Sequence, residues 1–179
     1  MKRAFLLALA LMLLLGCSYV VPTHSPVSGT PNLELTEQDL AQLGMSGSCR
    51  TEAYETGPYS SLAQYSFCNY TISSLPDTKV IVELSQFSNV TDLNGTYQYS
   101  SLHLRSAEGL ISENEYGDQS RFYVNNENDY GGQYTDPSIS YYSLYFTKNE
   151  YLVHVTSGGS KEAEAYIADI GRRILAKFE

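Results

Sequence analysis

The feature that most limits the fold of this chain is an apolar run near its N-terminus, "AFLLALALMLLL", which spans residues 4–15 and follows Lys2 and Arg3. A helix rises about 1.5 Å per residue and a bilayer core is about 30 Å thick, so a membrane-spanning helix needs roughly 20 apolar residues. This run has only 12. A charged start, a short apolar stretch and a small residue at its end, Gly16, are the parts of a secretory signal peptide. We therefore expect residues 1–16 to be removed on export, so that the fold is built from the rest of the chain.

The end of the run, Leu14-Leu15-Gly16-Cys17, resembles the lipobox of bacterial and archaeal lipoproteins. The resemblance implies that a diacylglyceryl group is attached to the thiol of Cys17 and that the chain is cleaved before it. It covers residues 1–17 only, and Leu15 is less usual at its position than Ala or Ser. An ordinary signal peptide with Cys17 as a bystander is the alternative, although an A-x-A cleavage site is missing. We expect a protein that is lipid-anchored to the cell membrane and faces the extracytoplasmic side.

Two cysteines, Cys49 and Cys68, remain once Cys17 is assigned to the lipid. An even pair in an exported domain indicates a disulfide, and two buried free thiols are the alternative. No C-x-x-C pair and no histidine lies near them, so the spacing of zinc ligands is absent. Closing this loop stabilises a fold by about 3 kcal/mol on the chain-entropy estimate.

The charge of the mature chain limits its partners. Removal of Lys2 and Arg3 leaves nine of the eleven basic side chains against twenty acidic ones, a formal charge of −11. Nucleic-acid binding needs clustered Lys and Arg, so we expect no nucleic-acid partner. The same charge disfavours docking on anionic lipid headgroups, which leaves the acyl anchor as the membrane contact.

The mature chain divides into a tether and one domain. Residues 17–32 contain three prolines and no hydrophobic period, which predicts a flexible, extended tether that starts at the lipidated cysteine. Residues 33–179 have the length of a single domain with a sizeable core.

Helix-like and strand-like segments alternate along this domain. A short helix is predicted between Thr36 as N-cap and Gly44 as stop, a second at 90–107, and a C-terminal amphipathic helix after a cap at Ser160. The six predicted strands are 48–55, 63–72, 79–87, 119–126, 138–147 and 151–158. We predict an α+β fold, with an antiparallel sheet of about six strands and helices, including the C-terminal one, on one face.

The order of the closing segments, "GDQSRFYV … SLYFTKNEYLVHVTSGGSKEAEAYIADIGRRIL", is similar to that of extracytoplasmic sensor-like and Mog1-like lipoprotein domains. Accessory proteins of photosystem II with a Mog1-like fold have a related layout. The likeness covers residues 36–179 in element order, through short and generic motifs. It implies a binding or assembly module and transfers no site residue.

No motif in the chain predicts catalysis. G-x-S-x-G is absent, and "SGGSK" at 157–161 matches neither G-x-x-x-x-G-K nor S-x-x-K, so we interpret it as a strand-to-helix turn. His103 and His154 share no short motif with another histidine and are interpreted as structural or surface residues. We assign no catalytic residue, metal or cofactor. Paired carboxylates meet in space rather than in sequence, so a hydrolase that uses them remains the alternative.

The most distinctive local chemistry lies in an acidic, tyrosine-rich segment, residues 113–136. Alternating oxygen ligands there suit Ca²⁺, although the spacing fails the EF-hand pattern, and tyrosines beside carboxylates suit a sugar or a protein surface. A solvated acidic loop is the other interpretation. The possible ligand or cation contacts are Asn125, Glu127, Asp129, Tyr130 and Tyr134.

Three N-x-T sequons, at Asn69, Asn89 and Asn94, permit N-glycosylation where the source has that machinery. Asn69 lies in a predicted strand, which predicts poor access.

These features together predict a membrane-anchored extracytoplasmic lipoprotein that acts as a non-catalytic ligand- or protein-binding module at the cell envelope. The expected partner is an envelope protein or a glycan. An envelope hydrolase with paired carboxylates and a structural assembly subunit are the alternatives.

Overall fold

The computed structural model describes residues 27–57, 60–102, 109–125 and 138–179. The predicted signal peptide and Cys17 lie outside these ranges. Within the described ranges, no helix combines the length and the apolar character needed to cross a membrane.

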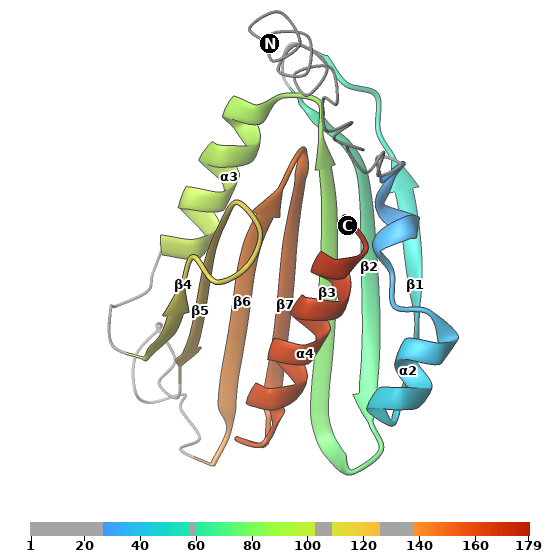
Figure 1. Cartoon of the computed structure of the whole chain (residues 1–179), viewed down its shortest axis with the longest axis vertical. Helices are drawn as coiled ribbons and strands as arrows, with labels where there is room; N and C mark the ends of the chain where they lie inside the picture. Colours follow the sequence, from blue (N-terminus) through green and yellow to red (C-terminus); the bar gives the residue numbers. More distant parts are fainter. Residues whose placement is uncertain (1–26, 58–59, 103–108, 126–137) are drawn as a thin grey trace, which may run out of the picture.

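Seven antiparallel strands form one sheet (Figure 1), in the order β1-β2-β3-β7-β6-β5-β4. Its two halves meet at the centre, where β3 pairs with β7 from Lys79 opposite Gly158 to Gln86 opposite Tyr151. The strands are β1 (Met45–Ala53), β2 (Leu62–Ile72), β3 (Leu75–Phe87), β4 (Leu110–Glu113), β5 (Gln119–Asn125), β6 (Ser140–Lys148) and β7 (Tyr151–Gly159). The α+β class agrees with the prediction, but the sheet has one strand more than expected. The extra strand is β4, whose four residues are too few to show an alternating pattern.

Helices cover both faces of the sheet, so the prediction of helices on one face was wrong. They are the 3₁₀ helix η1 (Thr30–Leu33), α2 (Glu37–Leu43), α3 (Val90–Leu102) and α4 (Ala163–Ala176). Helix α4 shares one core with Val153 of β7, whereas α3 shares a second core with the preceding residue, Leu152. Neighbouring residues of a strand point to opposite faces, so the two helices lie on opposite sides.

The main core lies between the sheet and α4, which crosses in front of β3, β6 and β7 in Figure 1. The apolar stripe expected from the sequence comprised Ala163, Ile167, Ile170, Ile174 and Phe178. Its first four residues are fully buried, whereas Phe178 lies beyond the end of the helix and is partly buried. The helix begins at Ala163 rather than directly after Ser160, with Glu162 as its N-cap. The Ser160 hydroxyl accepts a hydrogen bond from the backbone N–H of Glu162 at 3.4 Å and donates one to the Glu162 carboxylate, so it holds the turn before the helix.

Helix α2 begins and ends where its sequence predicts. Thr36 accepts a hydrogen bond from the backbone N–H of Asp39, and the Asp39 carboxylate accepts one from the N–H of Thr36 in return. Gly44 ends the helix with a left-handed φ of 61°.

The segment before η1, assigned from the sequence to the tether, is folded against the sheet from Val27 onward. The Tyr151 hydroxyl accepts a hydrogen bond from Gly29 N at 2.9 Å and donates one to Val27 O at 3.0 Å. Thr30 is fully buried and its N–H donates to Gln64 Oε1 at 2.7 Å. One of the three prolines that suggested a linker, Pro31, is compatible with this packing, because it stands in the first turn of η1.

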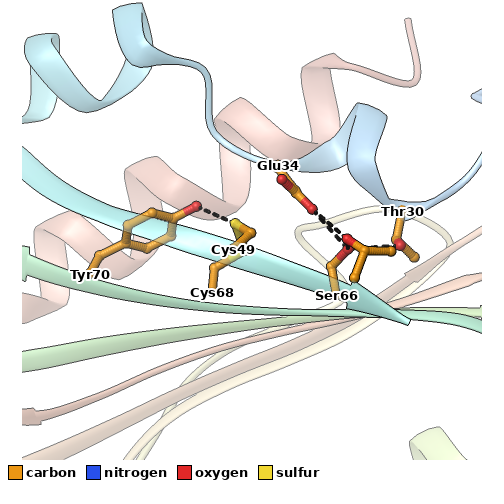
Figure 2. The surroundings of a disulfide bond; sticks show 7 residues. Thr30, Glu34, Cys49, Ser66, Cys68 and Tyr70 are labelled. Carbon is orange, nitrogen blue, oxygen red and sulfur yellow. Dashed lines mark hydrogen bonds between the residues drawn. A yellow bond between two sulfur atoms is a disulfide. The ribbon is translucent and has the colours of Figure 1, made fainter.

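A disulfide joins Cys49 of β1 to Cys68 of β2, which agrees with the pairing expected from the sequence. The two residues are direct partners in the antiparallel register (Figure 2). Tyr70 approaches Cys49 Sγ from one side, at 3.0 Å. On the other side, Glu34 accepts a hydrogen bond from Ser66 at 2.9 Å, so polar contacts from the η1 segment lie over the disulfide-bonded strands.

Candidate functional site

Helix α3 covers only part of its side of the sheet. We call the remainder the open face, and its side chains come from alternate positions of β1, β2, β3, β7 and β6. None of its members is fully buried, and Tyr141 is 44% exposed. The residues that define the open face are Arg50, Phe67, Ile81, Tyr141 and Thr156. Within the described part of the chain, no helix lies over this surface of polar, aromatic and aliphatic side chains.

The open face ends in a hollow of about 790 Å³, which we call the end groove. Its walls come from the β2–β3 turn, the start of β6 and the end of β7. The lining residues are 74–79, Ile81, Ser138, Ile139, Tyr141 and 156–160. Small-molecule sites have volumes of about 300–1,000 Å³, so the end groove is large enough for a ligand.

Tyr141 and Gly158 form a cross-strand pair on the floor of the end groove. A Cβ atom added to Gly158 would lie 3.1 Å from Cε1 and 3.3 Å from Cδ1 of the Tyr141 ring. The ring therefore lies over the glycine, in space that a side chain would otherwise occupy. Because the residue is still 44% exposed, part of this aromatic ring faces solvent.

Side-chain charges in the end groove balance. Lys79 supplies one cation and Asp77 one anion, and both are exposed. The other polar side chains are serine and threonine hydroxyls. Three of these hydroxyls bond backbone groups: Thr78 accepts from Ser160 N at 2.9 Å, Thr156 donates to Tyr142 O at 2.7 Å, and Ser160 accepts from Glu162 N at 3.4 Å.

A second polar cluster lies farther along the same side of the sheet, beneath α3. His154 Nδ1 is 2.7 Å from Glu83 Oε2, and the Tyr65 hydroxyl donates to Glu83 Oε1. The Tyr145 ring stacks on the imidazole with centroids 3.9 Å apart and an interplanar angle of 4°. With Thr96 of α3 and other neighbours, these residues line a cavity of about 210 Å³, which we call the His154 pocket.

The Glu83 carboxylate is held in its charged form by its neighbours. The hydrogen bond with His154 lowers the pKa of Glu83, burial partly opposes this, and the Tyr65 hydrogen bond lowers the pKa further. Burial and the bond to Glu83 raise the pKa of the Tyr65 phenol. An ionised carboxylate only accepts hydrogen bonds, so His154 donates from Nδ1 to Glu83.

This arrangement lacks the parts of a serine hydrolase. In a Ser–His–acid triad, the imidazole nitrogen opposite the carboxylate bonds the nucleophile. That atom is Nε2 of His154, and it is buried with no hydrogen-bond partner within the described ranges. Thr96 and Ser100 line the pocket but do not bond it.

Paired carboxylates are also missing from the pockets described so far. The end groove contains Asp77 as its single acidic residue, and the His154 pocket contains Glu83. A glycosidase needs two carboxyl groups about 5–9.5 Å apart across the scissile bond. Among the described residues, these two hollows therefore offer no glycosidase geometry.

The structure describes one of the five residues expected to contact a ligand or cation. Asn125 ends β5 and is the register partner of Tyr141 in β6, beside the end groove. The other four lie outside the described residues, and the site expected from them stays a prediction: Glu127, Asp129, Tyr130 and Tyr134. The three sequon asparagines, Asn69, Asn89 and Asn94, are all exposed, so the expectation of poor access at Asn69 was wrong.

One group of possible metal ligands occurs within the described part of the chain, formed by Glu34, Cys49 and Cys68. Its two sulfur atoms are bonded to each other, so they are not thiolate ligands. The remaining carboxylate is used by hydrogen bonds from Thr51 and Ser66. The group does not fit a metal ion.

Sequence reasoning missed both the end groove and the carboxylate partner of His154. Their residues lie far apart in the chain and meet only because β3 pairs with β7. The alternation "YLVHVTSGG" placed His154 on a strand face but gave no sign of Glu83, 71 residues earlier. Gly158-Gly159 at the end of a strand was the available signal, since a glycine in a strand often marks close approach of another group.

No protein-family model matches this chain, and no curated protein matches it significantly. Among solved structures, it is similar to the extracellular domain of PknH from Mycobacterium tuberculosis. That match has a TM-score of 0.55 and 11% identity, and it covers 87% of this chain and 98% of the PknH domain. A second match is LpqN, involved in cell envelope biogenesis of Mycobacterium tuberculosis, with a TM-score of 0.34, 10% identity and coverage of 80% and 95%. The first match shows a shared fold, whereas the second score is too low to support an argument.

Proposed function

We propose that this protein is a lipid-anchored extracytoplasmic module that binds a ligand or a protein at the cell envelope and catalyses no reaction. The observation that carries the proposal is the end groove, a hollow of about 790 Å³ on a part of the sheet that none of the described helices covers. A partly exposed aromatic ring, Tyr141, lies on its floor. Concave sites of this size with a few polar groups are where proteins bind small molecules and chain segments.

Three features support the proposed location. The apolar run before Cys17 has the parts of a lipoprotein signal peptide, and Cys49 and Cys68 form a disulfide, as exported domains often do. The fold is also that of the extracellular domain of PknH, which places one neighbour of this fold outside the cytoplasm.

The binding function is favoured over the hydrolase alternative by what the pockets contain. The end groove and the His154 pocket have one carboxylate each among their described lining residues, Asp77 and Glu83. Glu83 is committed to hydrogen bonds with His154 and Tyr65, so it is a poor proton carrier. A groove with balanced charge and an aromatic floor suits binding better than acid–base chemistry.

The test is photo-crosslinking in native membranes. A benzophenone side chain is introduced at position 141, in the end groove, or at position 172, which is exposed on α4 on the opposite side of the sheet. The proposal expects a discrete adduct from position 141 and none from position 172. It also expects a diacylglyceryl mass on the membrane-bound protein, and loss of both lipid and membrane association in Cys17→Ser.

Two outcomes would contradict the proposal. Equal or absent adducts from the two positions exclude the end groove as the binding surface. A protein that is unlipidated and soluble contradicts the lipid anchor. Failure of the anchor and failure of the binding surface can be told apart, because mass and adducts are measured on the same samples.

A further inference from the structure

Tyr141 is set up as a flat platform in the end groove. Its register partner is Gly158, and the absent side chain leaves room for the ring to lie on the β7 backbone. A side chain at that position would come within 3.1 Å of the ring. One part of the ring is thus fixed against backbone while the residue keeps 44% of its surface exposed.

A fixed, half-exposed aromatic ring selects for a ligand with a flat, weakly apolar surface. The C–H groups on one side of a sugar ring form such a surface, and they pack on an aromatic face while the sugar hydroxyls point outward to polar neighbours. Tyrosine suits this role because it combines an apolar ring with a polar tip and loses little conformational entropy on binding.

The rest of the groove matches the other groups of a sugar. Most of its polar side chains carry a hydroxyl, which is both donor and acceptor like the groups of a sugar. Those of Thr78 and Ser157 are buried, whereas Ser74, Ser138, Thr156 and Ser160 are exposed or partly exposed. Lys79 and Asp77 cancel in charge, so the groove offers no net charge to a phosphate, a carboxylate or a cationic chain. The formal charge of the whole chain, −9, further disfavours an anionic ligand.

From these observations we propose that the end groove binds a neutral glycan, with one sugar ring stacked on Tyr141. This inference rests on the proposed function, whose site it shares, and adds the chemical class of the ligand. An extended peptide is the competing occupant. It is disfavoured because the groove does not follow a free strand edge: β3, β7 and β6 are all paired on both sides.

The inference is tested by calorimetric titration of the full-length protein in mild detergent with neutral oligosaccharides of two to four units. The probes are cello-, malto- and manno-oligosaccharides, and random tetrapeptides are titrated in parallel. Binding of at least one sugar series is expected. Tyr141→Ala is expected to weaken that binding at least tenfold, and Tyr141→Phe, which keeps the ring, less than threefold.

Tyr54→Ala is the matched control, because Tyr54 is exposed to a similar extent, 42%, and does not line the groove. It is expected to leave sugar binding unchanged. Gly158→Ala tests the geometry from the other side: its new Cβ displaces the ring and is expected to weaken sugar binding while Tyr141 itself is intact.

The inference is overturned if no sugar series binds, if Tyr141→Ala binds as the wild type does, or if only the peptides bind. A peptide-only result, together with a position-141 adduct in the membrane experiment, would leave the binding module standing and remove the glycan. An absent adduct would remove the binding module itself. Circular dichroism and thermal unfolding of each variant separate lost binding from lost folding.

Discussion

Asp39 connects two helices at the level of a single side chain. Its carboxylate accepts hydrogen bonds from Thr36, the N-cap of α2, and it pairs with Arg173 at 3.1 Å and Lys177 at 3.4 Å near the end of α4. Burial raises the pKa of this carboxyl, but the bonds from Thr36 and Arg173 and the charge of Lys177 outweigh it and lower the pKa to about 2. The folded state therefore favours the charged form.

The lowered pKa of Asp39 predicts that Asp39→Asn loses stability to an extent that depends on pH. The folded pKa of about 2 lies below the ordinary value of 3.8, so the carboxylate stabilises the fold fully above pH 3.8 and loses this contribution as the pH falls toward 2. We expect Asp39→Asn to lower the free energy of unfolding by about 1–2 kcal/mol at pH 7, discounted for partial solvent screening. Urea unfolding at pH 7, 4 and 2.5 measures the difference, which should shrink at the lowest pH. A constant difference across this range would contradict the assignment.

Single residues also show where sequence reasoning succeeds. Thr36 and Gly44 were predicted as the ends of α2, and they are, because capping is decided by residues three or four positions apart. The pairing of Cys49 with Cys68 followed from counting alone. Tyr141 was different: its value as a platform depends on Gly158, and only the β6–β7 register reveals that they are partners.

At the scale of elements, the predictions that were correct depend on residues close together in the chain. Those that were wrong depend on which distant strands pair. Helix α4 shows its buried stripe within 14 residues, and the sequence identifies it. Helix α3 was expected, but the face of the sheet that it covers depends on the order of strands. The sequence of β7 did not indicate which face a helix covers, because the adjacent residues Leu152 and Val153 are both apolar and are buried on opposite faces.

The edge pair β1 and β2 depends on the disulfide. Strand β1 is mostly exposed and pairs only with β2, so Cys49–Cys68 is its covalent attachment to the sheet. Replacing both cysteines by alanine is expected to lower the free energy of unfolding by about 3 kcal/mol. Because β1 is an edge, hydrogen exchange should rise first in residues 45–53.

Denaturant unfolding and hydrogen-exchange mass spectrometry check this prediction. The wild type under strong reductant is the control, because it loses the disulfide but keeps both cysteine side chains. The double variant and the reduced wild type are expected to agree within about 1 kcal/mol. Uniform exchange across all seven strands would mean that the disulfide stabilises the whole sheet, and would contradict a local role.

At the scale of the whole molecule, the two ends of the described chain meet at Tyr151. This residue begins β7 and is almost fully buried, with its ring edge against Phe178 at a centroid distance of 5.6 Å. Its hydroxyl bonds the backbone of Val27 and Gly29. The position at which the N-terminal segment joins the domain is therefore fixed by the central part of the sheet, which sets how the proposed tether leaves the domain.

Tyr151→Phe tests this connection with the loss of one oxygen atom. It removes the hydrogen-bond partner of Gly29 N and Val27 O, which should cost about 1–3 kcal/mol if these groups stay buried, and less if the segment detaches into water. Detachment is the expected response, because the segment is terminal and frees itself without opening the core. Hydrogen exchange in residues 29–33 should then rise at least tenfold while exchange in β7 and α4 is unchanged.

Tyr142→Phe is the matched control, since it removes a hydroxyl that bonds the backbone carbonyl of Lys161 at 2.9 Å, away from the N-terminal segment. It should leave exchange in residues 29–33 at the wild-type rate. If Tyr151→Phe also leaves that rate unchanged, contacts such as Thr30 with Gln64 hold the segment without Tyr151. If exchange instead rises across the whole sheet, the N-terminal segment is an integral part of the core, and the tether begins at a point that cannot move independently of the domain.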